Sequence, residues 1–281
     1  MKEYDKYLKL LKEKYPTKQS VYRELINLNA IMNLPKGTEH FMSDLHGEYD
    51  VFYHIINNCS GVIREKVAML YGDELTVYEQ QELCTLIYYP REKLSILMDE
   101  NKVNDEWYRN VLNQLIQIAK LLSSKYTRSK VRKAMPVDFA YIIDELIHAQ
   151  KDEDDNRSVY HRQIMETILS LHNGDEFLVA LTDLIKRLAV DHLHILGDIY
   201  DRGAHADKIL DLLMEHHSVD IQWGNHDILW MGAFCGNPVC MALVVRNNIK
   251  YKTMSILENG YGISLRFLLQ FACLLYTSPS P

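Results

Sequence analysis

The stretch VDHLHILGDIYDRGAHADKILDLLMEHHSVDIQWGNHD, residues 190–227, decides the fold. Leu193, Ile195 and Leu196 form a short apolar run that ends at Gly197, and residues 206–214 then place apolar side chains at helical spacing. A second strand-like run follows at residues 219–223. A strand, a helix and a strand within about thirty residues are typical of a parallel pair with a right-handed crossover. This segment therefore predicts an α/β fold.

The rest of the chain reads mainly as helix. Apolar side chains recur at helical spacing in residues 7–11 and 21–34, before a short extended segment at 40–43. Helical spacing then continues to residue 190, with an acidic loop at 152–155 that we interpret as solvated surface. We expect four segments: N-terminal helices with the first core strand (1–50), a helical insertion (51–189), the continued core (190–273) and a non-native tail (274–281).

Composition excludes several classes of protein. The chain has 281 residues and a net charge of −7, which gives no global electrostatic reason to expect nucleic acid or an anionic membrane as partner. Its most apolar stretch, residues 267–276, is much shorter than the ~20 residues that span a bilayer. The five cysteines form no CxxC pair, which favours reduced, buried thiols in a cytoplasmic protein.

Three polar clusters stand where predicted strands end. They contain Asp44 and His46, then Asp198, Asp201 and Arg202, then Asn225 and His226. Ligands of open α/β sheets bind beyond the carboxyl ends of the strands, so we expect the clusters to converge. Carboxylate, imidazole and carboxamide ligands without thiolate favour Mn²⁺, Fe²⁺ or Zn²⁺.

The residue types suggest separate roles for these residues within a two-metal site. In an extended segment, Asp44 and His46 would point the same way and hold one ion. The two oxygens of Asp198 could bridge ions about 3.5–4 Å apart, and Asn225 would hold the second ion. His226 would then be free to act as an acid, with Asp201 orienting it.

Arg202 would supply a planar donor for phosphate oxygens.

Each cluster also has a structural alternative. Asp44 and Asp198 could cap helices, Asp201 and Arg202 could form a surface ion pair, and residues 225–226 could be a polar turn.

These clusters resemble the calcineurin-like metallophosphoesterase superfamily, whose pattern DxH, GDxxDRG and GNH[DE] is complete here. The resemblance implies that the metal ligands are Asp44, His46, Asp198 and Asn225. It also implies that His226 is the proton donor, Asp201 its carboxylate partner and Arg202 the phosphate clamp.

A closer resemblance covers roughly residues 1–273. As many as 154 positions separate Asp44 from Asp198, and this long helical insertion is similar to that of class III fructose-1,6-bisphosphatases. The opening YLKLLKEKYPTKQSVYRELINLNAIMNLPKGTEHFMSDLHGEYDVFYHIINNCSGVIREKV and the segments GNHDILWMGAFCG and LENGYGISLRF also resemble that family. The resemblance implies hydrolysis of fructose 1,6-bisphosphate to fructose 6-phosphate in gluconeogenesis, with Mn²⁺ as cofactor, and allows a homo-oligomer.

Two other functions stay open at this point. One is a phosphatase of the same superfamily that acts on phosphoproteins or dinucleotide polyphosphates, and the other is a noncatalytic helical scaffold.

The superfamily completes its metal centre with two further histidines, yet no histidine follows His226. With the unusual residues 274–281, this predicts the amino-terminal part of a longer enzyme, which alone would bind metal weakly and hydrolyse little.

Three further features have mainly structural interpretations. We interpret the basic run of residues 125–133 as a solvated face, although it could supply a second anion site for a bisphosphate. His192, His194, His216 and His217 are expected to be structural, the last pair because they end a helix. The apolar stripe Leu229, Trp230, Met231 and Phe234 is expected to pack rather than to line a substrate groove.

Overall fold

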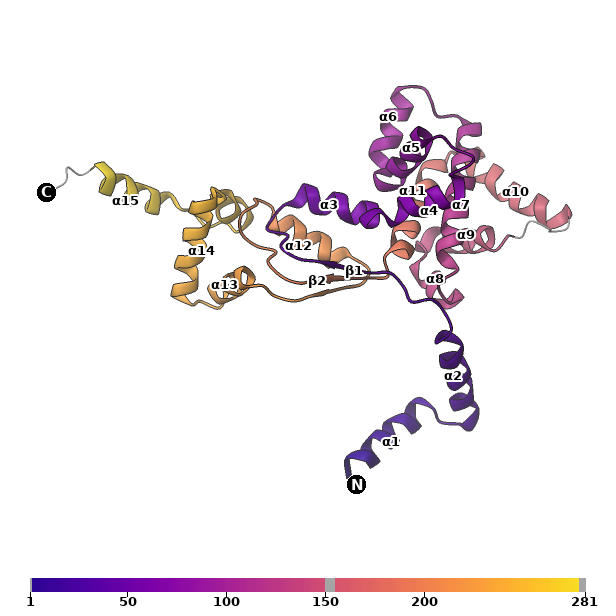
Figure 1. Ribbon diagram of the computed structural model, residues 1–281, viewed down its shortest axis with the longest axis horizontal. Coiled ribbons are helices and arrows are strands. Elements are labelled where there is room, and N and C mark those ends of the chain that lie inside the picture. Colours follow the sequence, from indigo (N-terminus) through magenta and orange to yellow (C-terminus); the bar gives the residue numbers. More distant parts are fainter. Residues whose placement is uncertain (1, 150–154, 278–281) are drawn as a thin grey trace.

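A computed structural model describes residues 2–149 and 155–277 and shows a mostly helical chain around a small parallel sheet (Figure 1). The sheet has the order β1 (Glu39–Met42), β2 (His192–Ile195) and β3 (Val219–Ile221), and both neighbouring pairs are parallel. Helix α12 (Ala206–Glu215) connects β2 to β3. The predicted strand–helix–strand unit and the α/β class are therefore confirmed.

Helices make up most of the remaining described chain. In chain order they are α1 (Lys2–Lys14), α2 (Lys18–Ile31), α3 (Tyr49–Asn58), η1 (Cys59–Gly61), α4 (Val62–Tyr71), α5 (Val77–Tyr88), α6 (Pro90–Asp99), α7 (Asp105–Ser123), α8 (Arg128–Ala134), η2 (Val137–Phe139), α9 (Ala140–Ile147), α10 (Asp155–Ser170), α11 (Gly174–Ala189), α13 (Asn225–Phe234), α14 (Pro238–Tyr251), η3 (Ile256–Gly260) and α15 (Arg266–Thr277). Parts of two predicted segments, residues 152–154 of the acidic loop and 278–281 of the tail, lie outside the described residues.

Helices α4–α11 share one hydrophobic core, separate from that of the sheet. The helix α11 packs against α7, and buried side chains such as Leu115 and Phe177 lie between the helices of this group. Local signals fix the helix ends: Thr76 and Glu79 form a capping box at the start of α5, and Pro90 is the first residue of α6. These helices correspond to the apolar spacing seen in the sequence.

The sheet has one buried face. Along β2, Leu193 and Ile195 are buried whereas His192 and His194 are partly exposed, as the period of a strand requires. Leu193 and Ile195 pack with Phe52 of α3 and Ile209 of α12, and both helices lie on the same side of the sheet (Figure 1). The opposite face, which carries the two histidines, is open to solvent at several side chains.

The outermost helices bury little apolar surface. No residue of α2 is buried, and Leu10 and Ile26 are exposed although they follow helical spacing. Cys235 and Cys273 are exposed and Cys240 is partly exposed, so the expectation of buried thiols is wrong for these three, which lie at the end of α13 and in α14 and α15. No described helix combines the length and apolar character needed to cross a bilayer.

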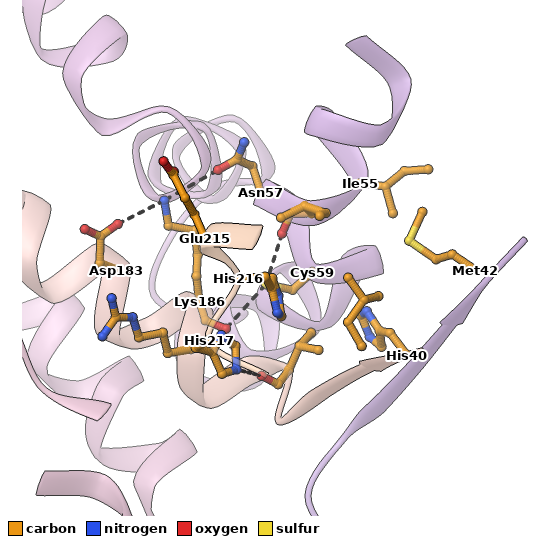
Figure 2. A pocket seen from close by; sticks show the side chains of 14 residues that line it. His40, Met42, Ile55, Asn57, Cys59, Asp183, Lys186, Glu215, His216 and His217 are labelled. Atoms are coloured by element: carbon orange, nitrogen blue, oxygen red, sulfur yellow. Dashed lines mark hydrogen bonds and ion pairs between the residues drawn. The ribbon is translucent and has the colours of Figure 1, made fainter. Parts of the chain in front are cut away.

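A cavity of about 240 Å³ lies between the sheet and the helices (Figure 2). Its lining includes Cys59, Lys186 and His216, and none of the predicted site residues. Lys186 is neutralised there by Asp183 at 3.2 Å and contacts Asn57, as the dashed lines in Figure 2 mark. The cavity is therefore separate from the predicted site residues.

His216 and His217 have structural roles, as expected, but the reason given by the helix dipole is wrong for His216. Its Nδ1 lies 3.0 Å from the carbonyl oxygen of Ser218, and His217 Nε2 lies 2.9 Å from that of Val190. Burial, helped by the neighbouring His217, lowers the pKa of His216 to about 4. At neutral pH the ring is uncharged, so it gains nothing from the helix dipole.

We expect His216 to make the protein less stable in mild acid. Its pKa is depressed from the usual 6.5, so below that pH the unfolded chain binds more protons than the folded chain. The neutral ring's contribution to the free energy of unfolding is present above pH 6.5 and is lost as the pH falls toward 4. For this partly exposed ring the loss is roughly 1–2 kcal/mol. Urea unfolding of wild type and His216→Gln from pH 7 to pH 4.5 measures this, and equal slopes in both proteins would contradict it.

Candidate metal centre and its acid

The loops that follow β1 and β2 run side by side and continue the pairing of the strands. The Asp44 N–H donates to the carbonyl of Gly197 at 3.1 Å, and the His46 N–H donates to that of Asp198 at 2.8 Å. Gly47 N–H then donates to the carbonyl of Ile199 at 2.8 Å. These bonds bring together two segments that are far apart in the sequence, as the position of the clusters at strand ends predicted.

Two glycines allow these loops to touch. Gly47 has a φ of +68°, and a Cβ there would lie 2.5 Å from the carbonyl oxygen of Gly203. A Cβ on Gly203 would in turn lie 2.5 Å from the carbonyl oxygen of His46. The Gly203 N–H donates to that same oxygen at 2.6 Å, so the contact is a backbone hydrogen bond with no room for a side chain.

Replacing Gly47 by alanine is therefore expected to destabilise the protein more than the same change at Gly61. Gly61 also has a positive φ, of +88°, but a Cβ there would meet no atom within 4 Å. Gly61→Ala should cost about 1 kcal/mol for its left-handed backbone, and Gly47→Ala a further 1–3 kcal/mol, roughly, for the overlap. Urea denaturation gives the free energy of unfolding of both variants. An equal decrease in the two would show that the contact between Gly47 and Gly203 is not tight.

Three of the predicted ligands converge on one point. Asp44, His46 and Asp198 can each offer an atom such that all three atoms lie within 4.8 Å of one another. His46 is only 5% exposed, and its Nδ1 donates to the carbonyl of Tyr200 at 3.0 Å, because a carbonyl oxygen can only accept. That bond leaves the lone pair on Nε2.

The Nε2 of His46 has the character of a metal ligand. It is buried, it forms no hydrogen bond, and it lies 3.4 Å from Oδ1 of Asp44. A buried polar atom without a partner is costly, and a cation held jointly with the two carboxylates would satisfy it. The Nδ1 bond to a backbone carbonyl is the usual orienting contact of a histidine ligand. The donor set therefore fits a divalent cation.

The way in which Asp44 and His46 meet differs from our expectation. Their φ angles are +54° and +46°, so the segment is a left-handed turn beyond the end of β1 and not an extended strand. Asp198 has a similar φ of +56°. Such backbone conformations are costly for residues with a Cβ and concentrate at functional sites. The turn, stabilised by the loop pairing, brings the side chains together.

The structural alternatives for these clusters are wrong in three respects. The N-caps of α3 and α12 are Glu48 and His205, so neither Asp44 nor Asp198 caps a helix that follows. Asp201 is fully buried and therefore does not form a surface ion pair with the exposed Arg202. The loops are organised around these side chains.

His226 lies beside the metal-ligand cluster and is held by Asp201. Its Nδ1 lies 2.6 Å from Oδ2 of Asp201, and its ring meets that of His46 edge-on with the centroids 5.5 Å apart. Because a buried carboxylate accepts hydrogen bonds, we assign the proton to Nδ1 of His226, which leaves Nε2 for other contacts. The backbone N–H of His226 also donates to Oδ1 of Asp198 at 3.1 Å.

Two residues that hold Asp201 were not identified from the sequence. Trp230 Nε1 donates to its Oδ1 at 3.0 Å, and Asn247 Nδ2 donates to its Oδ2 at 2.8 Å. Trp230 lies one turn after His226 in α13, a spacing that could have suggested a role next to the site. It stacks on Tyr200, with the ring centroids 4.5 Å apart.

The predicted apolar stripe of α13 is only partly a packing surface. Leu229 and Trp230 pack against a small core with Leu257, but Met231 is exposed and Phe234 is 93% exposed. Trp230 also has a polar role, because its indole N–H donates a hydrogen bond to Asp201.

Asp227, the last residue of the GNHD block, organises the loop of the second cluster. Its Oδ1 accepts from the N–H groups of Ile199 at 2.9 Å and Tyr200 at 3.2 Å. Its Oδ2 accepts from the N–H groups of Asp198 at 2.7 Å and Gly224 at 2.8 Å. One carboxylate thus joins the loop after β2 to the start of α13.

The remaining predicted residues are less constrained by the structure. Asn225 is the exposed first residue of α13 and directly follows Gly224, whose backbone lies against the Asp198 carboxylate. Arg202 is exposed, with a φ of +75°. In the basic run, Lys130 pairs with Asp191 at 2.6 Å and Lys125 contacts the hydroxyl of Thr38, contacts that favour a structural role.

The fold and the site define a protein with α/β architecture and clustered metal-type ligands at the ends of parallel strands, and sequence comparison identifies the family. The family described as Firmicute fructose-1,6-bisphosphatase matches residues 6–280. The chain belongs to this family.

Curated relatives carry a related name. The chain is 53% identical to "Fructose-1,6-bisphosphatase class 3 1" of Clostridium beijerinckii, over 98% of this chain and 43% of that protein. It is 54% identical to "Fructose-1,6-bisphosphatase class 3" of Listeria monocytogenes and 53% identical to that of Clostridium acetobutylicum, over 96% of this chain and 41% of each relative. The chain thus spans about two fifths of the length of these relatives. No solved structure matches it.

Proposed function

We propose that the chain belongs to a metal-dependent phosphatase that removes the 1-phosphate of fructose 1,6-bisphosphate, giving fructose 6-phosphate and phosphate for gluconeogenesis. The observation that carries this proposal is the buried, unpartnered Nε2 of His46 between two carboxylates, with the His226–Asp201 pair beside it. The names of the relatives supply the substrate. The ligand pattern supports a calcineurin-like core for the sheet.

We assign the metal ligands by donor type and position. Asp44, His46, Asp198 and Asn225 would hold a pair of divalent ions, with Mn²⁺ preferred and Fe²⁺ or Zn²⁺ as alternatives. Bound metal would supply positive charge that acidifies a water molecule and polarises phosphoryl oxygens. Exposed Arg202 would bind phosphoryl oxygens through its planar guanidinium group.

The protein's own acid is His226. Asp201 accepts from Nδ1 of His226, and this bond orients the ring so that Nε2 would deliver a proton to the leaving sugar oxygen as that oxygen develops charge. Trp230 and Asn247 in turn hold both oxygens of Asp201. Since Asp201 is fully buried and satisfied, the imidazole has one orientation before substrate binds.

We also propose that the helical insertion, 51–189, is a separate packing unit inserted into the core of residues 1–50 and 190–273. In support of this division, the side chains of α4–α11 form one hydrophobic cluster and those of β2 and α12 belong to another. The first helix of the insertion, α3, is an exception, because its Phe52 packs with the cluster of β2 and α12. The insertion favours the sugar bisphosphate over the other substrates of the superfamily, because its length matches the class III resemblance.

A substrate panel tests the proposal. Metal-stripped protein is reloaded with Mn²⁺, and phosphate release is measured from fructose 1,6-bisphosphate, a phosphoserine peptide and a dinucleotide polyphosphate. We expect release from the sugar bisphosphate to be fastest and to disappear with chelator. Faster release from either other substrate would replace the proposed substrate, and release from all three no faster than that of a His226→Ala variant would contradict a catalytic role for this chain.

A further inference from the structure

The open face of the sheet carries a second group of metal-type ligands, distinct from the Asp44 centre. His192, His194 and Asp220 can each offer an atom such that all three atoms lie within 4.8 Å of one another. His192 and His194 are two residues apart on β2, so they point to the same face. The strand register places Asp220 of β3 directly opposite His194. The backbone pairing of the sheet therefore fixes this triad.

Neighbouring side chains orient both imidazole rings toward Asp220. His194 stacks on Phe41 of β1, with centroids 4.4 Å apart and planes 14° from parallel, and its Nδ1 lies 2.9 Å from Oδ1 of Asp220. His192 Nε2 lies 3.2 Å from Oδ2 of the same carboxylate. Both rings thus aim a nitrogen at one carboxylate.

Ser218 allows His192 to give up the proton on that nitrogen. Its Oγ lies 2.7 Å from Nδ1 of His192. A hydroxyl can donate or accept, so it can follow a change of tautomer that moves the ring proton from Nε2 to Nδ1. The lone pair of Nε2 would then face Asp220 without movement of the ring.

The triad is accessible to an ion. The side chains of His192, His194 and Asp220 are 29%, 22% and 52% exposed. Hydrogen bonds from His194 and His192 lower the pKa of Asp220, so this group is an anion at neutral pH. Two imidazoles and one carboxylate are a known set of three protein ligands for Zn²⁺, in sites where water takes the fourth position. The exposed side of this triad leaves room for that water.

We propose that His192, His194 and Asp220 bind a transition-metal ion of the Zn²⁺ or Ni²⁺ type, joining β2 to the edge strand β3. The nitrogen-rich ligand set distinguishes it from the Asp44 centre, which has mainly oxygen ligands. Imidazole favours Zn²⁺ and Ni²⁺ over Mn²⁺, so the two sites should respond to different metals. The site does not depend on the proposed phosphatase activity.

Metal binding by calorimetry tests the proposal. Metal-free wild type, His194→Gln and Asp220→Asn are titrated with Zn²⁺ and, separately, with Mn²⁺, with Asp211→Asn on the exposed side of α12 as matched control. We expect both triad variants to lose one Zn²⁺ per chain or to bind it at least about tenfold more weakly, with Mn²⁺ binding unchanged. Unchanged Zn²⁺ binding, or an equal loss of Mn²⁺ binding, would overturn it.

A second measurement on wild type does not depend on the folding of a variant. Diethyl pyrocarbonate modifies accessible imidazoles, and mass spectrometry locates the modified residues. One equivalent of Zn²⁺ beyond the amount that saturates the Asp44 centre should protect both His192 and His194, while the exposed His172 keeps its rate. Modification of His192 and His194 at the same rate with and without Zn²⁺ would overturn the proposal.

Discussion

His226→Ala is expected to slow phosphate release from fructose 1,6-bisphosphate by about 10²–10⁴-fold, the range typical of a lost general acid. The imidazole is held by Asp201 at 2.6 Å and lies beside the His46 ring, so its removal takes away the proton donor without removing a carboxylate ligand. Metal content should stay near that of wild type. Phosphate release and metal analysis on the same preparation measure both.

A matched control on the same helix separates acid chemistry from helix packing. Met231 is exposed on α13 and is not one of the predicted site residues, so Met231→Ala should keep the wild-type rate. Asp201→Asn should lower the rate as well, because an amide at this position can donate to Nδ1 and so favour the wrong tautomer. A His226→Ala protein with the wild-type rate would remove His226 from the acid role.

Asp227→Ala is expected to destabilise the protein by roughly 3–5 kcal/mol and to weaken metal binding. The carboxylate is 6% exposed and accepts four backbone N–H groups, from residues 198, 199, 200 and 224. Its removal leaves these donors without partners, and each unsatisfied buried donor costs about 1–3 kcal/mol before water or local relaxation compensates. Urea unfolding gives the stability, and calorimetry with Mn²⁺ gives the affinity.

The comparison for this variant is Asp211→Ala, an exposed carboxylate on α12 that should change stability by less than about 0.5 kcal/mol. Asp227→Asn should fall between, since the amide oxygen can still accept while its NH₂ group opposes two of the donors. If Asp227→Ala were as stable as Asp211→Ala, the loop would not depend on this carboxylate.

The location of the site could be predicted from the sequence because it follows from strand order. The apolar run before Gly197 and the strand-like run before Gly224 indicated parallel strands, whose ends lie at one edge of a sheet. The polar blocks stand at those ends, so Asp44, His46 and Asp198 had to converge if the first segment joined the same sheet. The register of β1 against β2 and the bonds that continue it explain why they do.

The details of the site depend on contacts that residue patterns do not encode. Asp227 acts on four backbone groups, and only the path of the loop shows which groups they are. Asn247 reaches Asp201 from α14, with no local pattern linking the two. The left-handed turn at Asp44 and His46 likewise follows from the contact of Gly47 with Gly203. Tertiary packing fixed these features.

Histidine patterns were ambiguous for a related reason. Alternation along β2 showed that His192 and His194 share a face, but their proximity to Asp220 required the register of β3. At the end of α12, the position of His216 suggested a charged ring, whereas burial lowers its pKa to about 4. Solvent exposure and cross-strand neighbours, which the sequence does not show, decide both cases.

The measurement that tests the central claim most directly is Mn²⁺ binding by metal-free wild type and His46→Gln. Because the buried Nε2 of His46 would be a direct metal ligand, the variant should bind Mn²⁺ at least about tenfold more weakly, the loss that changes to residues behind the ligands already cause. Its fold, followed by circular dichroism, should be unchanged. Equal Mn²⁺ affinity in the two proteins would contradict the metal centre at Asp44, His46 and Asp198.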